Sequence, residues 1–169
     1  MKKSEKRNKA ISNHYRIKRE GYQLQGQRDV HDANMPNLHR EGCLLYWAEG
    51  SKHRTMVCFT NSDIEMVRLF AKFLIECYDI NPNDFRLQLN CYLNNGLSLD
   101  KIKQTWKDAV GITDQNYEFQ YCKVNKNRGS CGKLKYGICQ LRLHNVMVVQ
   151  RIYGSIQEYW NIKREEWIS

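Results

Sequence analysis

Basic side chains are concentrated in residues 121–144, where they could neutralise phosphate groups. This stretch of 24 residues contains six lysines and arginines, no acid, and a glycine-rich centre. Like charges so close in the chain repel each other, and a bound anion would offset this repulsion. We therefore predict a basic hairpin that follows a phosphate backbone, with a solvated hairpin as the alternative. The basic residues are Lys123, Lys126, Arg128, Lys133, Lys135 and Arg142.

Further polar groups come from the alternating stretch FRLQLNCYL at residues 85–93. Alternation of apolar and polar residues is typical of a strand with one buried face. The other face would present a guanidinium, two amides and a phenol, which can hydrogen-bond to base edges. A plain solvated face is the commoner case and stays open as the alternative. The polar residues are Arg86, Gln88, Asn90 and Tyr92.

Cys122, Cys131, Cys139 and His144 are of the types that bind zinc, but eight, seven and four residues separate them. Structural zinc sites use a short CxxC-like pair, so this spacing argues against zinc, and a zinc-stabilised basic protein stays open only as the weakest alternative. His53 and His144 could act as general bases, yet no serine or cysteine stands in a nucleophile motif. No glycine-rich nucleotide motif occurs either, so we predict neither a catalytic triad nor a nucleotide cofactor.

Glu49 is the only charged residue between Gly42 and Ser51. The preceding residues are apolar nearly all round from 43 to 48, which predicts a buried helix that ends at Gly50. A carboxylate at the carboxyl end of a helix faces the negative end of the helix dipole and needs a compensating cation. Lys52 or Arg54 could supply it in a surface ion pair, and a bound cation could do the same.

The elements that would position these residues alternate along the chain. We predict strands at 55–60, 85–93, 117–124 and 134–143. We predict helices at 38–50, at 63–78 behind a capping box at Ser62 and Glu65, at 98–110 between Ser98 and Gly111, and from Asn145 onwards. This order predicts an α+β fold in which an antiparallel sheet has helices packed on one face.

Residues 1–37 are predicted to form a basic N-terminal arm, and residues 38–169 the folded domain. Residues 1–41 contain ten lysines and arginines against five acids. A thin apolar stripe at Ile11, Tyr15 and Tyr22 would allow a helix that docks on the domain. A disordered tail fits the composition equally well.

The composition favours a nucleic-acid partner. The 169 residues carry a net charge of +9, and 41% of them are hydrophobic, enough for one core. A cationic protein of this kind attracts polyanions. We expect no secretory signal and no membrane span. The odd number of cysteines, seven, indicates a reducing compartment, cytoplasmic or nucleoid-associated.

The segment GCLLYWAEG at residues 42–50 resembles the nine-residue motif of the LAGLIDADG homing endonucleases. Ala48, Glu49 and Gly50 match the final small residue, acid and glycine, whereas Leu44 and Trp47 depart from the family's glycine and acid. The later strands, basic segment and closing helix are similar to the saddle-shaped sheet of that family. The resemblance covers residues 38–160, and the helix at 98–110 is additional to it.

The resemblance implies a homodimer in which two motif helices pack along the two-fold axis. It implies that Glu49 of each subunit binds Mg²⁺ at a scissile phosphate, and that Lys52, Lys135 and Gln88 position water or stabilise charge there. The nucleic-acid contacts would then come from Arg54, the polar strand residues and the basic segment. The expected activity is metal-dependent hydrolysis of duplex DNA. The alternative is a protein of the same fold that binds DNA or RNA without cleavage, as a transcription regulator or splicing factor.

Overall fold

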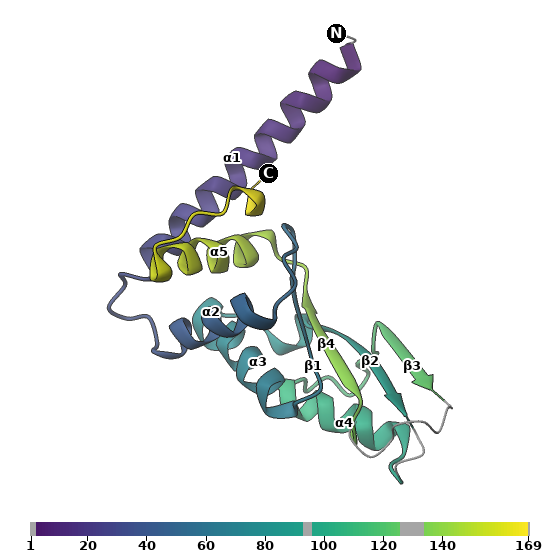
Figure 1. Cartoon of the computed structure of the whole chain (residues 1–169). Helices are drawn as coiled ribbons and strands as arrows, with labels where there is room; N and C mark the ends of the chain where they lie inside the picture. The colour runs from purple at the N-terminus through teal and green to yellow at the C-terminus, as the bar shows by residue number, and fades with distance from the viewer. Residues whose placement is uncertain (1–2, 93–95, 126–133, 169) are drawn as a thin grey trace.

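The computed structural model describes residues 3–92, 96–125 and 134–168. Within these ranges the protein has a mixed α+β fold, with five α-helices and one four-stranded sheet (Figure 1). The helices are α1 (Lys3–Asp29), α2 (Leu38–Glu49), α3 (Ile64–Tyr78), α4 (Leu99–Val110) and α5 (Val146–Trp160). The strands are β1 (Val57–Asn61), β2 (Arg86–Tyr92), β3 (Tyr121–Asn125) and β4 (Ile138–Leu143), and 3-10 turns lie at Pro82–Asp84 and Glu165–Trp167.

The sheet is mixed, which corrects the prediction of an antiparallel sheet. Its strand order is β1-β4-β2-β3, with β4 antiparallel to both of its neighbours. The edge strand β3 runs parallel to β2. Consequently β3 and β4 do not form the predicted hairpin, because β2 lies between them. Alternation in the sequence determines which face a strand residue takes, but leaves its neighbouring strand undetermined.

One face of the sheet forms the core. Phe59, Leu141 and Leu87 lie side by side on β1, β4 and β2, and none of them is exposed. Helices α2 to α5 contribute to the same buried cluster, through residues such as Phe70 and Trp106. Aromatic packing is tight there, as the rings of Phe59 and Phe70 stack with centroids 4.4 Å apart. The alternation predicted for residues 85–93 is confirmed over β2, whose apolar side chains face this core.

Helix caps follow local chemistry. Helix α3 is capped by Asp63, whose carboxylate accepts the N–H groups of Glu65 and Met66. This corrects the predicted cap at Ser62, because a carboxylate one residue later reaches the same donors and complements the helix dipole. For α4 the prediction is confirmed. The Ser98 hydroxyl accepts the N–H of Lys101, and Gly111 ends the helix at a left-handed φ of 79°.

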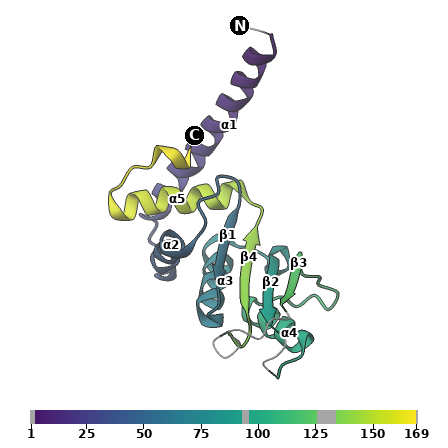
Figure 2. The ribbon, with the colours of Figure 1, turned by 45° about the vertical axis from the view of Figure 1, so that its right-hand side comes forward.

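Helix α1 is anchored through its second half only. Residues 4–18 are exposed, and the helix projects away from the rest of the fold (Figures 1 and 2). Close to its end it crosses α5, where glycines allow the backbones to touch. A Cβ on Gly26 would lie 2.0 Å from the Arg151 carbonyl oxygen, and one on Gly154 would lie 2.0 Å from that of Gln23. Buried Gln23 also bonds to Gln150 at 2.7 Å. Of the two alternatives for this region, the structure has the docked helix.

Candidate nucleic-acid interface

Two arginines stand next to each other on the polar face of the sheet. Arg86 of β2 is directly opposite Arg142 of β4, and Cys58 of β1 completes the row. Arg86 is exposed, whereas Arg142 is half-buried. Like charges in directly opposite positions destabilise a sheet, so this row favours a bound anion.

A row of neutral polar groups crosses the sheet next to the arginines. It runs from Thr60 through Gln140 and Gln88 to Tyr121. The Gln140 side-chain amide donates to the Thr60 hydroxyl at 2.8 Å, and the Gln88 side-chain amide donates to the side-chain Oε1 of Gln120 at 3.2 Å. The Tyr121 ring is 54% exposed. These groups can accept and donate hydrogen bonds, as contacts to base edges require.

The third row extends the polar face to the β3 edge. Asn90 lies between Ile138 and Lys123, and both Asn90 and Lys123 are exposed. Tyr92 follows on β2 and is half-buried. The exposure of Arg86, Asn90, Tyr121 and Lys123 shows that this side of the sheet is open, in contrast to the opposite side.

Glu49 lies at the carboxyl end of α2, beside the edge strand β1. The following residue, Gly50, forms an isolated antiparallel bridge with Phe59, and the Glu49 side chain is exposed. Thr60, the next residue on β1, begins the row of neutral polar groups. Thus the predicted acid stands at one border of the polar face.

Lys52 closes the end of α2. Its ammonium group donates to the carbonyl oxygens of Tyr46 at 3.2 Å, Trp47 at 2.9 Å and Gly50 at 2.5 Å. Burial lowers the pKa of Lys52, and the nearby charge of Glu49 raises it. A lysine at a helix carboxyl end complements the dipole, so Lys52 neutralises the carbonyl groups at the end of α2, and its charge also acts on nearby Glu49. No ion pair of Glu49 with Lys52 or with Arg54 occurs among the described residues, so the predicted surface ion pair is not formed there.

The other residues of the predicted catalytic set lie apart from Glu49. Gln88 is on the third strand from the β1 edge, about 10 Å across the sheet at the usual strand spacing. Lys135 precedes β4, while Lys52 precedes β1. Because β1 and β4 are antiparallel, these two lysines lie at opposite ends of the strand pair. Lys135 is exposed, with its Nζ 5.4 Å from the Tyr136 ring centroid.

Helix α2 is only partly buried, which corrects the prediction of a helix buried all round. Cys43 and Tyr46 are fully buried, but Leu44 is 49% exposed and Ala48 is exposed. Gly42 lies against α3, where a Cβ would come within 2.1 Å of the Phe73 ring. The apolar residues on the outer side of α2 therefore have no cover within the described chain.

Several predicted residues lie elsewhere or outside the described ranges. Arg54 is exposed in the loop before β1, away from the third row. Lys126, Arg128, Lys133 and Cys131 fall outside the described residues. Cys139 is fully buried and Cys122 half-buried on the core face. His53 and His144 are exposed.

The sequence interpretation did not identify Thr60 and Gln140 as part of this face. The signal was present for Gln140, because ICQLRL in β4 alternates as residues 85–93 do. It was absent for Thr60, because the first three residues of VCFTN in β1 are all buried. Placing them in one row with Gln88 required the strand order. The sequence alone did not provide it.

Comparisons with models of protein families, with curated proteins and with solved structures found no match to this chain. Among the described helices, none is both long enough and apolar enough to cross a membrane.

Proposed function

We propose that this protein binds duplex DNA across the polar face of its sheet, in a fold similar to that of the LAGLIDADG proteins. The observation that carries the proposal is the Arg86–Arg142 pair beside the row of neutral polar groups. Arginines fix the protein on phosphates, and amides and hydroxyls contact base edges. The net charge of +9 adds a general attraction for the polyanion.

The exposed side of α2 supports the homodimer that the resemblance implies. Leu44 and Ala48 are one helical turn apart and both exposed, so they can meet the same residues of a second copy. Packing of two α2 helices would bring the two Glu49 carboxylates to the same border of a doubled polar face.

Glu49 is the residue that would hold Mg²⁺ in this arrangement. Its carboxylate is exposed and offers the hard oxygen ligand that this ion prefers, and Mg²⁺ commonly uses one or two carboxylates together with substrate phosphates. Within the described residues no group of three or more His, Cys, Asp or Glu side chains surrounds it, so Glu49 would be the one protein ligand and DNA and water would have to supply the remaining oxygens. Bound there, Mg²⁺ would supply an activated water and neutralise charge on the phosphate. Lys52 holds the helix end that presents Glu49.

Cleavage is tested with supercoiled plasmid, Mg²⁺ and the variant Glu49→Gln. The proposal of an endonuclease expects nicking or cutting by the wild type and none by Glu49→Gln, with equal plasmid binding by both. If both proteins cut the plasmid at the same rate, Glu49 has no role in the cleavage reaction. Light scattering of Leu44→Glu against the wild type tests the dimer: a monomeric variant of a dimeric protein is expected.

A second function, binding without cleavage, is supported by the same site. Lys52 already balances the charge at the end of α2, so Glu49 has a structural cation without a metal. For a protein that binds without cleavage, we expect salt-sensitive binding to duplex DNA and no cut strand. Glu49→Gln is expected to bind the duplex as tightly as the wild type. Competition between duplex DNA and RNA of the same sequence then separates a transcription regulator from a splicing factor. Absence of binding to either nucleic acid would contradict both functions.

A further inference from the structure

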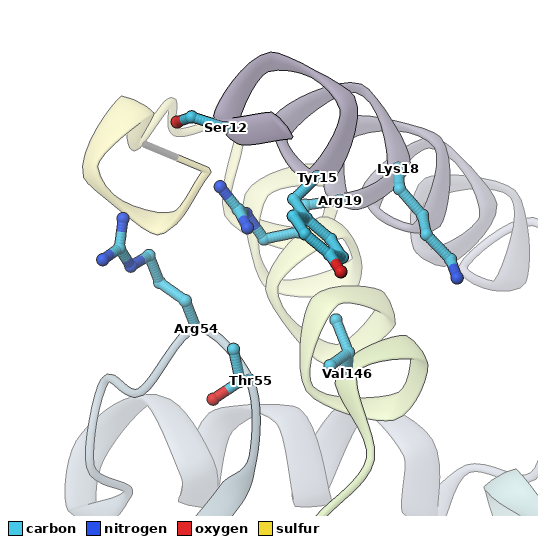
Figure 3. Close-up of a pocket in the computed structure, with 7 residues that line it drawn as sticks. All are labelled: Ser12, Tyr15, Lys18, Arg19, Arg54, Thr55 and Val146. Atoms are coloured by element: carbon cyan, nitrogen blue, oxygen red, sulfur yellow. The ribbon is translucent and has the colours of Figure 1, made fainter. Parts of the chain in front are cut away.

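A pocket of about 400 Å³ lies between α1, the loop before β1 and the first turn of α5 (Figure 3). It is separate from the rows of the polar face, although Arg54, which lines it, was predicted as a nucleic-acid contact. A volume of this size is typical of small-ligand sites. The residues at its wall are mainly basic or hydroxyl-bearing, and none of the lining residues is an acid.

Two guanidinium groups enter this pocket from opposite walls. Arg19 extends from α1, and Arg54 extends from the loop before β1 (Figure 3). Burial lowers the pKa of Arg19, and the like charge of Arg54 lowers it further. Two cations held so close together are unfavourable without an anion.

The neighbouring acid does not neutralise these arginines directly. Glu20 follows Arg19 in α1, but its carboxylate pairs with Arg16 at 2.6 Å. The Arg19 Nε donates to the Ile168 carbonyl oxygen at 2.7 Å, which fixes the side chain and leaves its terminal nitrogens for other contacts. No ion pair or hydrogen bond of the Arg54 side chain is found within the described ranges. Its guanidinium is thus available to a ligand.

Three hydroxyl-bearing residues also line the pocket. Ser12, Tyr15 and Thr55 contribute hydroxyl groups to the lining, and each hydroxyl can donate one hydrogen bond. Val146 opens α5, a helix of 15 residues, so the positive end of its dipole lies at the same wall. The Lys18 side chain points away from the arginines (Figure 3), and its Nζ lies 5.9 Å from the Tyr22 ring centroid.

We infer that this pocket binds a phosphate group between Arg19 and Arg54. The guanidinium fork matches phosphate oxygens through paired hydrogen bonds, and the hydroxyls can satisfy the remaining oxygen atoms. The pocket also lies at the end of the sheet that carries the two arginines, because Val57, close to Thr55, pairs with Leu143, next to Arg142. The phosphate group belongs either to a nucleic-acid backbone or to a free phosphate compound. The first source rests on the proposed function, and the second does not.

The first experiment uses inorganic phosphate as the probe. Isothermal titration of the full chain with phosphate, at ionic strength held constant with chloride, is expected to show one site in the wild type. Arg54→Gln is expected to weaken this binding by about tenfold or more, since it removes hydrogen bonds to a charged group. Arg28→Gln makes the same charge change at an exposed position of α1 outside the pocket and is expected to bind like the wild type. No binding by the wild type, or equal binding by Arg54→Gln, would overturn the inference.

The second experiment identifies the source of the phosphate group. If the backbone of bound DNA supplies it, Arg54→Gln reduces the slope of log affinity against log salt by about one, and Arg28→Gln does not. If a free phosphate compound supplies it, Arg54→Gln leaves the salt slope of DNA binding unchanged. The titration with inorganic phosphate still shows weaker binding by Arg54→Gln than by Arg28→Gln. Phosphate binding without any nucleic-acid binding would contradict the proposed function and leave the pocket inference standing.

Discussion

Arg86 and Arg142 occupy directly opposite positions on neighbouring strands of the open sheet face. The pairing places two positive charges where a sheet normally has neutral or opposite partners. In addition, the Arg142 Nε is buried and lacks a hydrogen-bond partner within the described structure. A buried donor without a partner costs free energy, and an anion between the two arginines would remove both penalties.

Replacing Arg86 by glutamine tests this relationship. The variant is expected to be as stable as the wild type or more stable by about 0.2–1 kcal/mol, because a cross-strand repulsion is removed. Duplex affinity is expected to fall, and the salt slope to decrease by about one, because one phosphate contact is lost. Fluorescence anisotropy over a range of salt concentrations measures the slope, and thermal unfolding measures the stability.

The matched control is Lys101→Gln, which removes the same charge from the exposed surface of α4. Its salt slope is expected to equal that of the wild type. A slope that Arg86→Gln leaves unchanged would argue against phosphate binding at this pair.

Lys52→Met should destabilise the fold by about 1 kcal/mol. The change retains most of the side-chain stem but removes the three hydrogen bonds from its ammonium group to the end of α2. Urea unfolding gives the free-energy difference. Lys72→Met is the control, since Lys72 makes only an exposed pair with Glu76 at 3.7 Å, and a change within about 0.5 kcal/mol is expected for it. Equal stability of both variants would show that Lys52 does not stabilise the helix end.

Two glycines in helices should respond in opposite directions to alanine. Gly42→Ala places a methyl group within 2.1 Å of the Phe73 ring and is expected to cost about 1–3 kcal/mol through overpacking. Gly21→Ala meets nothing within 4 Å and is expected to stabilise by about 0.5–1 kcal/mol, because alanine is the better helix residue. Thermal or urea unfolding of both variants tests this contrast. A harmless Gly42→Ala would mean that α2 and α3 are not packed as described.

His39 should make the fold sensitive to mild acid. Its ring lies buried between the hydroxyls of Tyr159 at 2.8 Å and Tyr78 at 3.1 Å. Burial lowers its pKa from 6.5 to about 4, with Asp29 opposing this shift and Arg151 adding to it. Above pH 6.5 the residue is neutral in both states, and its contribution to stability is fully present. As the pH falls from 6.5 towards 4, only the unfolded chain gains the proton, so stability decreases by up to about 1.4 kcal/mol per pH unit.

Nuclear magnetic resonance of the imidazole nitrogens measures this pKa directly in the folded protein. Denaturation of the wild type and of His39→Gln between pH 6.5 and pH 5 then measures the linkage, with a smaller pH dependence expected in the variant. A folded-state pKa near 6.5, the ordinary value, would contradict the buried neutral ring.

The sequence predicted well those features that depend on local chemistry. The cap of α4 at Ser98, its end at Gly111 and the alternating faces of β2 all follow from side chains close in the chain. The predicted cap of α3 was wrong by one residue, because Ser62 and Asp63 offer similar acceptors and backbone geometry decides between them. Of the four residues predicted to form a catalytic set, only Glu49 and Lys52 lie near each other, and these two are close in sequence. Lys135 and Gln88 lie apart from them.

By itself, the sequence determined the basic charge, the α+β class, the helix that ends at Glu49 and the polar character of one strand face. Periodicity and capping are local, so a single sequence displays them. The tertiary structure decided what depends on long-range pairing. It placed β2 between β4 and β3, set Arg86 against Arg142, and left Leu44 on the surface. It also brought Arg19 and Arg54 to one pocket, because strand order and helix docking are settled by the burial of the whole core.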